Sequence, residues 1–174
     1  LEPDTGAAIP KILYYEKRNI INSYGVLVHY TSICCPNLVD ETDPNNLEPT
    51  ETACGGIFMF RREIYEKVGA FDPDLFLYHE DHDLSWRIRL FGWKMRTTPK
   101  AEIYHHYHFN KGVFKYYSSE KNRLFLLLKN LEFKTLFLIF PALLIIEIAQ
   151  LAHAITNGWF FLKIKSYPEI VDIL

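Results

Sequence analysis

His79-Glu80-Asp81-His82-Asp83-Leu84-Ser85-Trp86-Arg87 is a short run that carries three carboxylates and two imidazoles. Leu84, Ile88 and Phe91 follow the i, i+4, i+7 spacing of an amphipathic helix, which Gly92 is expected to end. The acids therefore fall in the first helical turn, where free backbone amides and the helix dipole favour ionised carboxylates. Such a carboxylate can act as a general base, ligate a metal or simply cap the helix. The structural alternative is that the acids pair with Arg87 and Arg89 on the same helix.

The composition indicates one globular or membrane-associated domain. The chain has 174 residues, of which 49% are hydrophobic and 16% aromatic, enough for a sizeable core. Its 19 basic and 21 acidic residues give a net charge of -2, which argues against a nucleic-acid partner. Cys34, Cys35 and Cys54 have neither disulfide nor zinc-site spacing, so a reducing compartment is expected. The chain opens on Leu1 and a loop-like segment, as expected for the tail of a longer protein.

The residues before the acidic run predict a mixed sheet. Two apolar stretches, 9–15 and 25–30, suit strands, and 31–52 reads as a long polar loop of the kind that often forms a lid. Gly55-Gly56 then opens a predicted buried strand that ends at Phe60. A glycine pair permits close backbone approach to a ligand, but tight turns use the same pair.

The segments on either side of the acidic helix are also predicted. A charged helix is expected over 61–68, ended by Gly69. After Gly92, the segments 94–98 and 101–106 suit two short strands separated by Pro99.

The carboxy-terminal part contains a strongly apolar segment, 136–155. About 20 residues at ~1.5 Å each would just cross a bilayer core of ~30 Å. Its polar residues, however, fall on one side of a helical wheel: Glu147, Gln150, His153 and Asn157. That stripe favours a helix in the membrane interface, while a true span and a soluble core helix remain open. In either membrane case three lysines are expected to face anionic headgroups: Lys129, Lys163 and Lys165.

Several motifs in this order resemble the family 2 glycosyltransferases, and most closely their rhamnosyltransferase-like branch. They are GGIFMFRR at 55–62, VGAFD at 68–72 and EDHDLSWR at 80–87, followed by Gly92, Pro99 and His105, then Tyr116-Tyr117, KNRL at 121–124, Lys129-Asn130 and the apolar tail. The resemblance covers nearly the whole chain. Two positions depart from it, since the family usually has Arg in place of Lys121 and Ser in place of Asn110. The first departure puts a bidentate phosphate contact at position 121 in doubt.

The resemblance implies an α/β chain: the carboxy-terminal part of a GT-A fold, the Rossmann-like fold of nucleotide-diphospho-sugar transferases, followed by apolar membrane-associated helices. Residues 1–112 would be the acceptor side of the transferase domain and 113–174 the helical region. The implied activity is inverting transfer of a sugar from a nucleotide-sugar donor to a lipid-linked or surface glycan, as in polysaccharide biosynthesis. The implied location is the cytoplasmic face of the cell membrane, peripheral or single-span.

The resemblance also assigns roles to residues. Asp81 would be the catalytic base that removes the acceptor proton. Glu80 would hold an acceptor hydroxyl or orient the loop, and Trp86 and Arg87 would brace the helix or line the acceptor pocket. The substrate-binding set implied in this way is Gly55, Gly56, Glu80, Asp83, Trp86, Arg87, Lys121, Asn122 and Arg123, the last three near the diphosphate.

A divalent cation, Mg²⁺ or Mn²⁺, is implied for the leaving diphosphate. Its main Asp-x-Asp ligands would precede Leu1, and His105 is the positional match for an additional ligand, with His106 and His108 as close alternatives. Asp72-Pro73-Asp74 has the Asp-x-Asp spelling, but it belongs to the turn before the acidic run and is assigned no metal.

Two other functions fit the residues. In a metal-dependent hydrolase, His79, His82 and Asp83 would be ligands and Asp81 the base. Alternatively, the chain is a non-catalytic, membrane-associated scaffold fragment.

Overall fold

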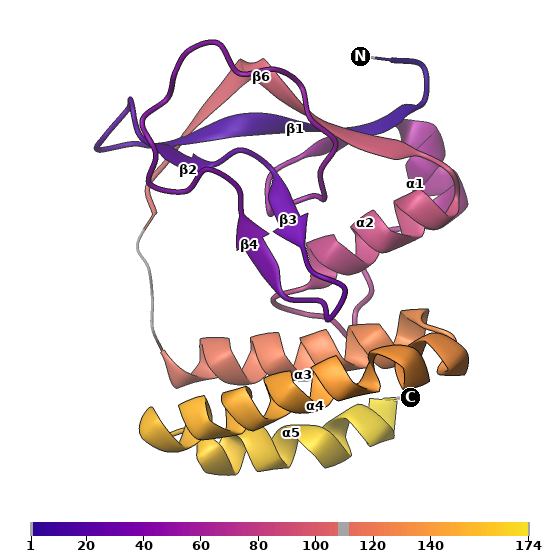
Figure 1. The fold of residues 1–174 in the computed structure, drawn as a ribbon. Helices are drawn as coiled ribbons and strands as arrows, with labels where there is room; N and C mark the ends of the chain where they lie inside the picture. Colours follow the sequence, from indigo (N-terminus) through magenta and orange to yellow (C-terminus); the bar gives the residue numbers. More distant parts are fainter. Residues whose placement is uncertain (1, 108–111, 174) are drawn as a thin grey trace. The chain divides into compact units, whose positions relative to one another are not determined.

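The computed structural model describes residues 2–107 and 112–173, which divide into two compact units (Figure 1). The first unit comprises Leu1–Val28, Cys34–Asp72 and Glu80–Phe109, and the second comprises His29–Ile33, Pro73–His79 and Asn110–Leu174. The mixed α/β architecture agrees with the fold class expected from the sequence. The second unit also takes in two short segments, 29–33 and 73–79, that the sequence placed with the transferase domain.

The sheet of the first unit is built around β1 (Thr5–Tyr14), which is buried along most of its length. β6 (Lys94–His105) pairs with one edge of β1 in parallel, while β2 (Ile21–Ser23) and β5 (Met59–Phe60) pair antiparallel with different ends of the other edge. A parallel pair needs a long crossover connection, and this one carries both helices of the unit.

β6 is one strand where the sequence predicted two. The register with β1 shifts between Pro10 and Lys11, where the partner changes from Thr98 to Glu102. Pro99 lies in that irregularity, where its missing N–H removes no ladder hydrogen bond. The prediction of two strands was therefore wrong, because a bulge accommodates the proline without ending the strand.

The strands predicted between 25 and 60 are shorter than expected. β3 (Val26–Val28) pairs with β4 (Cys34–Pro36), which lies in the segment expected to be a loop. The predicted buried strand before Phe60 is limited to β5, and its Met59 side chain is 77% exposed, so that prediction was wrong. Isolated β-bridges connect other residues of 31–52 to neighbouring segments, and one of them pairs Glu51 with Arg96 of β6.

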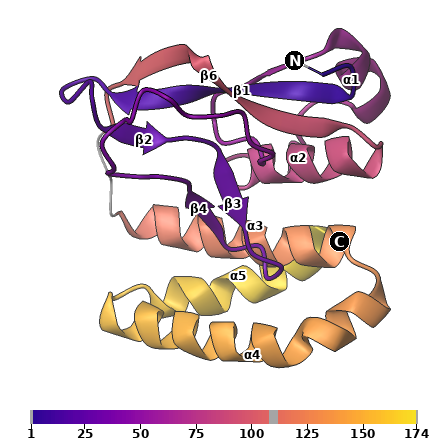
Figure 2. The ribbon, with the colours of Figure 1, turned by 45° about the horizontal axis from the view of Figure 1, so that its top comes forward.

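The two helices of the first unit begin and end close to the predicted residues. α1 (Arg62–Val68) ends at Gly69, which has φ of 87°, and α2 (Glu80–Leu90) is followed by Gly92, with φ of 84°. These left-handed angles favour glycine, as the sequence signals required. In Figure 2, α2 runs below β1 and β6, and α1 lies beside the end of β1 at which the chain begins. Side chains from both layers form the core: Ala7, Ile9, Cys54, Ile64, Leu84, Ile88 and Met95.

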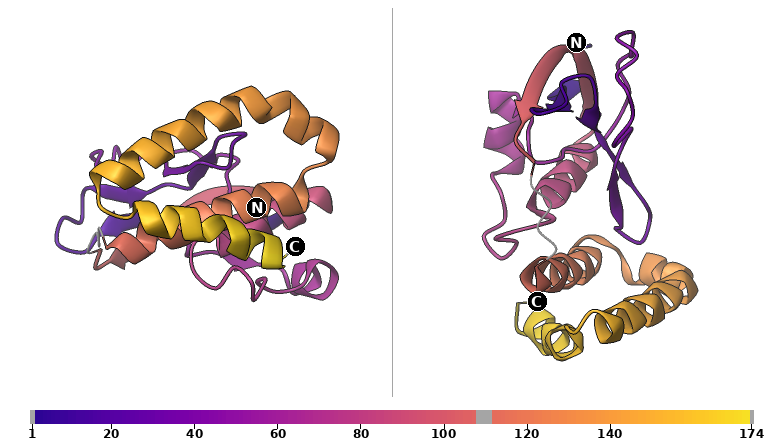
Figure 3. Two further views of the ribbon diagram at one scale, coloured as in Figure 1. Left: turned by 90° about the horizontal axis from the view of Figure 1, so that it is seen from below. Right: turned by 90° about the vertical axis from the view of Figure 1, so that its left-hand side faces the viewer.

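Within residues 112–173 the second unit contains three helices, and one of them, α5, packs against the other two (Figure 3). They are α3 (Val113–Asn130), α4 (Phe133–Thr156) and α5 (Phe160–Ile173). Leu75, Phe125 and Ile170 form a small apolar core in this unit, which links α3 and α5 to the segment 73–79.

Candidate functional site

The first turn of α2 holds the Asp81 carboxylate in a defined orientation. Its Oδ2 accepts a hydrogen bond of 2.7 Å from the backbone N–H of Gly56, and its Oδ1 accepts one of 2.8 Å from the N–H of His82. The structure thus brings together two residues that the sequence analysis named as candidates, Gly56 and Asp81.

Local geometry favours glycine at both positions of the pair. Gly56 has φ of 68°, a left-handed angle, and a Cβ on Gly55 would lie 2.5 Å from Cγ2 of Val26. Non-bonded carbon atoms do not come that close, so a side chain at position 55 would force Val26 to move. Glycine therefore lets this segment reach α2 without backbone strain or a clash with Val26.

Ser85 makes a second link between the same two segments. Its hydroxyl accepts a hydrogen bond of 2.8 Å from the N–H of Cys54 and donates one of 2.7 Å to the carbonyl of Asp81. The sequence analysis did not single out Ser85. The available signal was its i+4 spacing from Asp81 on a helix, which places the two on one face.

The electrostatic environment makes Asp81 a stronger base than an exposed aspartate. Burial raises the pKa of Asp81, and the hydrogen bonds from the Gly56 and His82 amides offset only part of that effect. A higher pKa increases the affinity of the ionised carboxylate for a proton, which suits a general base.

Asp83 and Arg87 fasten α2 to the end of α1. The Asp83 side chain is fully buried, and its Oδ2 accepts a hydrogen bond of 2.8 Å from Nε of Arg87. The guanidinium also donates to the carbonyls of Val68 and Ala70, at 2.7 and 2.8 Å. Arg87 was expected either to brace the helix or to line the acceptor pocket, and these contacts are of the first kind. The Asp83 carboxylate is thus paired with a side chain of the same helix.

His82 is buried beside a cysteine. Its Nδ1 lies 3.1 Å from Sγ of Cys34, and its ring stacks on that of Trp86 with centroids 5.9 Å apart. Burial lowers the pKa of His82 to about 4 and raises that of the Cys34 thiol to about 12. Both groups are therefore neutral near pH 7, and the pair is not an activated thiolate and imidazolium.

Of the ligands expected for the hydrolase alternative, Asp83 is paired with a cation instead. Asp83 is held by Arg87, and His82 faces Cys34. His79 belongs to the second unit, where its Nε2 lies 3.3 Å from the hydroxyl of Ser119. Glu80, the first residue of α2, is partly buried.

His105 lies at the end of β6, as expected from its sequence position. Its Nδ1 is 3.1 Å from Oδ1 of Asn22. In the tautomer with a proton on Nδ1, the imidazole donates to this amide oxygen, and Nε2 is the ring atom that can bind a cation. The alternative His106 pairs with Glu16 at 2.7 Å on the surface, and His108 lies outside the described residues. One imidazole is too few ligands for Mg²⁺ or Mn²⁺.

The three candidates on α3 all have partners within the second unit. Lys121 lies 3.9 Å from a Glu169 oxygen and faces the Tyr117 ring. Asn122 is buried and donates to the carbonyls of Leu77 and Tyr78. Their contact with a diphosphate stays a prediction, and each would have to share or exchange these partners to make it.

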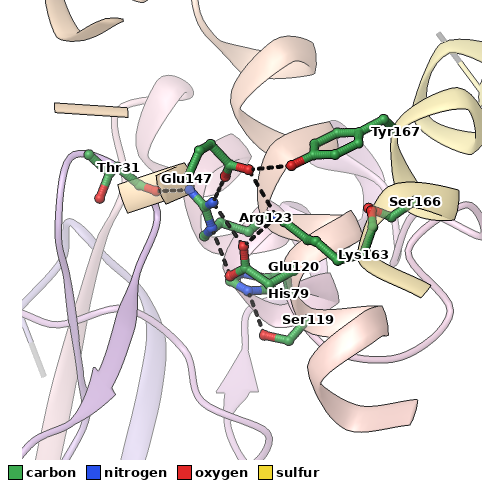
Figure 4. A network of polar contacts seen from close by, with 9 residues as sticks. All are labelled: Thr31, His79, Ser119, Glu120, Arg123, Glu147, Lys163, Ser166 and Tyr167. Atoms are coloured by element: carbon green, nitrogen blue, oxygen red, sulfur yellow. Dashed lines mark hydrogen bonds and ion pairs between the residues drawn. The ribbon is translucent and has the colours of Figure 1, made fainter. Parts of the chain in front are cut away.

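Arg123 belongs to a buried ionic network that joins the three helices (Figure 4). It donates to both oxygens of Glu120 at 3.0 and 2.9 Å, to the carbonyl of Thr31 at 3.1 Å, and to Glu147. Burial alone would raise the pKa of Glu120, but Arg123 and Lys163 lower it overall. The network holds α3, α4 and α5 together, and it already uses the guanidinium proposed for the diphosphate.

Lys163 lies inside this network and does not face a headgroup. Its side chain is fully buried, and its Nζ lies 3.0 Å from Glu120 and 2.9 Å from Glu147. The expectation for Lys163 was therefore wrong, because two carboxylates on neighbouring helices pair with it in the interior. Lys129 and Lys165 are exposed, and their contact with headgroups stays a prediction.

The apolar and polar sides of α4 differ in their surroundings. Glu147 and His153 contact side chains of α3 and the region of α5, whereas large apolar residues are exposed: Phe133, Phe137, Leu138, Phe140, Leu144, Ile145, Ile148 and Ile155. Among the described residues, α4 is the one helix long and apolar enough to cross a membrane, with a mean hydropathy of 2.1.

Comparison with known proteins identifies a related region within this chain. Residues 40–110, which include α1, α2 and β6, match the family described as the N-terminal domain of galactosyltransferase. Two curated relatives, both named N-acetylglucosaminyl-diphospho-decaprenol L-rhamnosyltransferase, come from the CDC 1551 and H37Rv strains of Mycobacterium tuberculosis. Each is 39% identical over 64 residues, which cover 34% of this chain and 21% of the relative.

Proposed function

Because the chain contains a glycosyltransferase-like region over residues 40–110, we propose that it is part of an inverting family 2 glycosyltransferase with a GT-A fold. The donor is a nucleotide sugar and the acceptor a lipid-linked or surface glycan. The two relatives are named as rhamnosyltransferases of an N-acetylglucosaminyl-diphospho-decaprenol. Their names therefore support a lipid-linked acceptor. The observation that carries the proposal is the Asp81 carboxylate, held at the start of α2 within the matched region.

In this proposal Asp81 is the general base. Each carboxylate oxygen accepts one backbone hydrogen bond and keeps a lone pair for the acceptor hydroxyl. The hydroxyl oxygen forms a bond to the anomeric carbon, its proton moves to Asp81, and the bond between that carbon and the diphosphate oxygen breaks. The nucleoside diphosphate leaves with the electron pair. The amides of Gly56 and His82 fix the direction of the carboxylate before the acceptor arrives.

A divalent cation, Mg²⁺ or Mn²⁺, would neutralise the charge of the leaving diphosphate. Among the described residues, Nε2 of His105 is the ligand that we propose, and the carboxylate ligands are proposed to come from a longer form of the protein. The hydrogen bond with Asn22 then orients the imidazole.

The location proposed is the cytoplasmic face of the cell membrane, with α4 lying in the interface. The polar side of α4 is used within the second unit, which leaves its exposed apolar side for lipid.

The test replaces Asp81 with Asn in the form of the protein that turns over a nucleotide sugar. Asn keeps the shape of the side chain but cannot accept the proton, so we expect kcat to fall by about 10²–10⁴-fold. The thermal midpoint should fall only slightly, because the Asn side chain can accept one of the two backbone hydrogen bonds that Asp81 accepts. Asp172→Asn is the matched control, because Asp172 is exposed on α5. Retained turnover in Asp81→Asn would refute the proposed base.

A further inference from the structure

Four polar side chains form a chain of hydrogen bonds at one end of the sheet: Asp40, Tyr14, Asn22 and His105. His105 is the last residue of β6 and the register partner of Tyr14, the last residue of β1. Asn22 lies on β2. Asp40 lies in the loop after β4, where its backbone N–H donates a hydrogen bond of 2.9 Å to the carbonyl of Ile21. All of these residues belong to the first unit.

The carboxylate of Asp40 sets the direction of the first bond. An exposed carboxylate is ionised near pH 7 and has no hydrogen to donate, so the Tyr14 hydroxyl donates to Oδ1 of Asp40, at 2.9 Å. The Tyr14 oxygen can then only accept a hydrogen bond from its second partner, Asn22. Burial raises the pKa of Tyr14, whereas the hydrogen bond with Asn22 lowers it, as expected when the amide donates.

The orientation of the Asn22 amide decides which nitrogen of His105 carries the proton. With its NH₂ group toward Tyr14, Asn22 presents its oxygen Oδ1 to Nδ1 of His105, 3.1 Å away. An amide oxygen only accepts, so Nδ1 carries the hydrogen in this arrangement, and Nε2 has the lone pair that a cation can bind. If the amide were reversed, Nδ1 would accept and the proton would lie on Nε2, which could then not bind a cation.

We propose that Asp40 and Tyr14 are positioning residues, which hold His105 in the tautomer that can bind a cation. They act through Asn22, because the two ends of its amide have nearly the same shape and the bond to Tyr14 determines which end faces the imidazole. The inference rests on the proposed role of His105 as a ligand of the divalent cation. Changes to the outer partners of a histidine ligand lower metal affinity by about 10–100-fold.

The experiment measures the tautomer of His105 by NMR of the imidazole nitrogens in this chain, which needs neither a cation nor turnover. Spectra are recorded at alkaline pH, where the imidazole is neutral. Tyr14→Phe keeps the ring and removes the hydroxyl, so the Asn22 amide is free to reverse. Tyr104→Phe is the matched control, because Tyr104 also donates to a carboxylate, that of Glu102 at 3.2 Å, but has no place in the chain of bonds.

The tautomer ratio decides the proposal. We expect the form with the proton on Nδ1 to exceed the other by at least about tenfold in the wild-type protein and in Tyr104→Phe, since the other form loses the hydrogen bond to Asn22. The ratio should fall by at least about threefold in Tyr14→Phe. Asp40→Asn, an exposed change that keeps the fold, should lower it less, because an amide can both donate and accept. A proton mainly on Nε2 in the wild-type protein, or equal ratios in all variants, would overturn the proposal.

A second change tests the direction of the chain of bonds. In the Tyr14→Phe background, Asn22→Asp replaces the amide by a carboxylate, which can only accept whichever way it turns. The double variant should therefore regain the tautomer with the proton on Nδ1 of His105. Failure to regain it would show that Tyr14→Phe acts by altered packing, and would overturn the role of the hydroxyl.

The requirement for the cation is then measured on a longer form of the protein that turns over a nucleotide sugar. In Tyr14→Phe the Mn²⁺ concentration for half-maximal activity should rise by about 10–100-fold, with the donor KM at saturating Mn²⁺ unchanged. An unchanged Mn²⁺ requirement despite an altered tautomer would overturn the link between His105 and the cation. If no form of the protein shows turnover, the proposed function fails separately, and the NMR ratio still decides whether Asp40 and Tyr14 fix the tautomer.

Discussion

At the scale of single residues, the proposed transferase activity depends on the protonation of Asp81. Burial raises the pKa of this carboxyl, and only its ionised form can accept the acceptor proton. Activity is therefore present above the folded-state pKa and is lost as the pH falls through it. We predict that the acid limb of the kcat/KM profile lies at higher pH than the value of about 4 for an exposed aspartate. An acid limb at or below that value, measured with saturating cation, would contradict the buried environment of the base.

At the scale of elements, α4 is the helix whose surroundings point to a membrane. Leu138 and Ile145 are 78% and 68% exposed and lie two turns apart on one side of the helix. Burial of such a side chain is worth about 1.5–3 kcal/mol, so Leu138→Gln with Ile145→Gln should weaken binding to anionic lipid vesicles by more than tenfold in a flotation assay. Met59→Gln on β5, equally exposed, is the control and should bind normally. Unchanged binding of the α4 double variant would exclude this face as the attachment site.

The helix boundaries and the acidic cluster were predictable because their signals are local. Gly69 and Gly92 mark the ends of α1 and α2, and the i, i+4 spacing around Leu84 shows which face of α2 is buried. The acidic residues were placed in the first turn of that helix by the same spacing, whereas the choice of Asp81 as base came from the family resemblance. Short-range rules of this kind need no knowledge of tertiary contacts.

Features that depend on distant partners could not be read from the sequence. Lys163 is buried because Glu120 and Glu147, on two other helices, pair with it, whereas an isolated lysine is expected on the surface. Pro99 was taken to divide two strands, but the register shift opposite Lys11 keeps β6 continuous. The contacts of Asn122 with the turn before α2 likewise appear only when the chain is folded.

At the scale of the whole molecule, the proposed function assigns this chain part of an active site. The matched stretch spans 21% of each curated relative, and one imidazole, that of His105, is too few ligands for a divalent cation. We therefore propose that a longer chain binds the nucleotide and the metal. In that proposal the described residues of this chain supply the base, the glycine segment that orients it, and the apolar helix.

The most direct measurement is release of nucleoside diphosphate from a panel of nucleotide sugars, with Mg²⁺ or Mn²⁺ and a membrane lipid extract. It is made on this chain and on a version extended upstream of Leu1. We predict release only by the extended form, with one donor and with dependence on the lipid extract. No release by a folded extended protein, with any donor, would contradict the assignment as a glycosyltransferase and favour a non-catalytic scaffold.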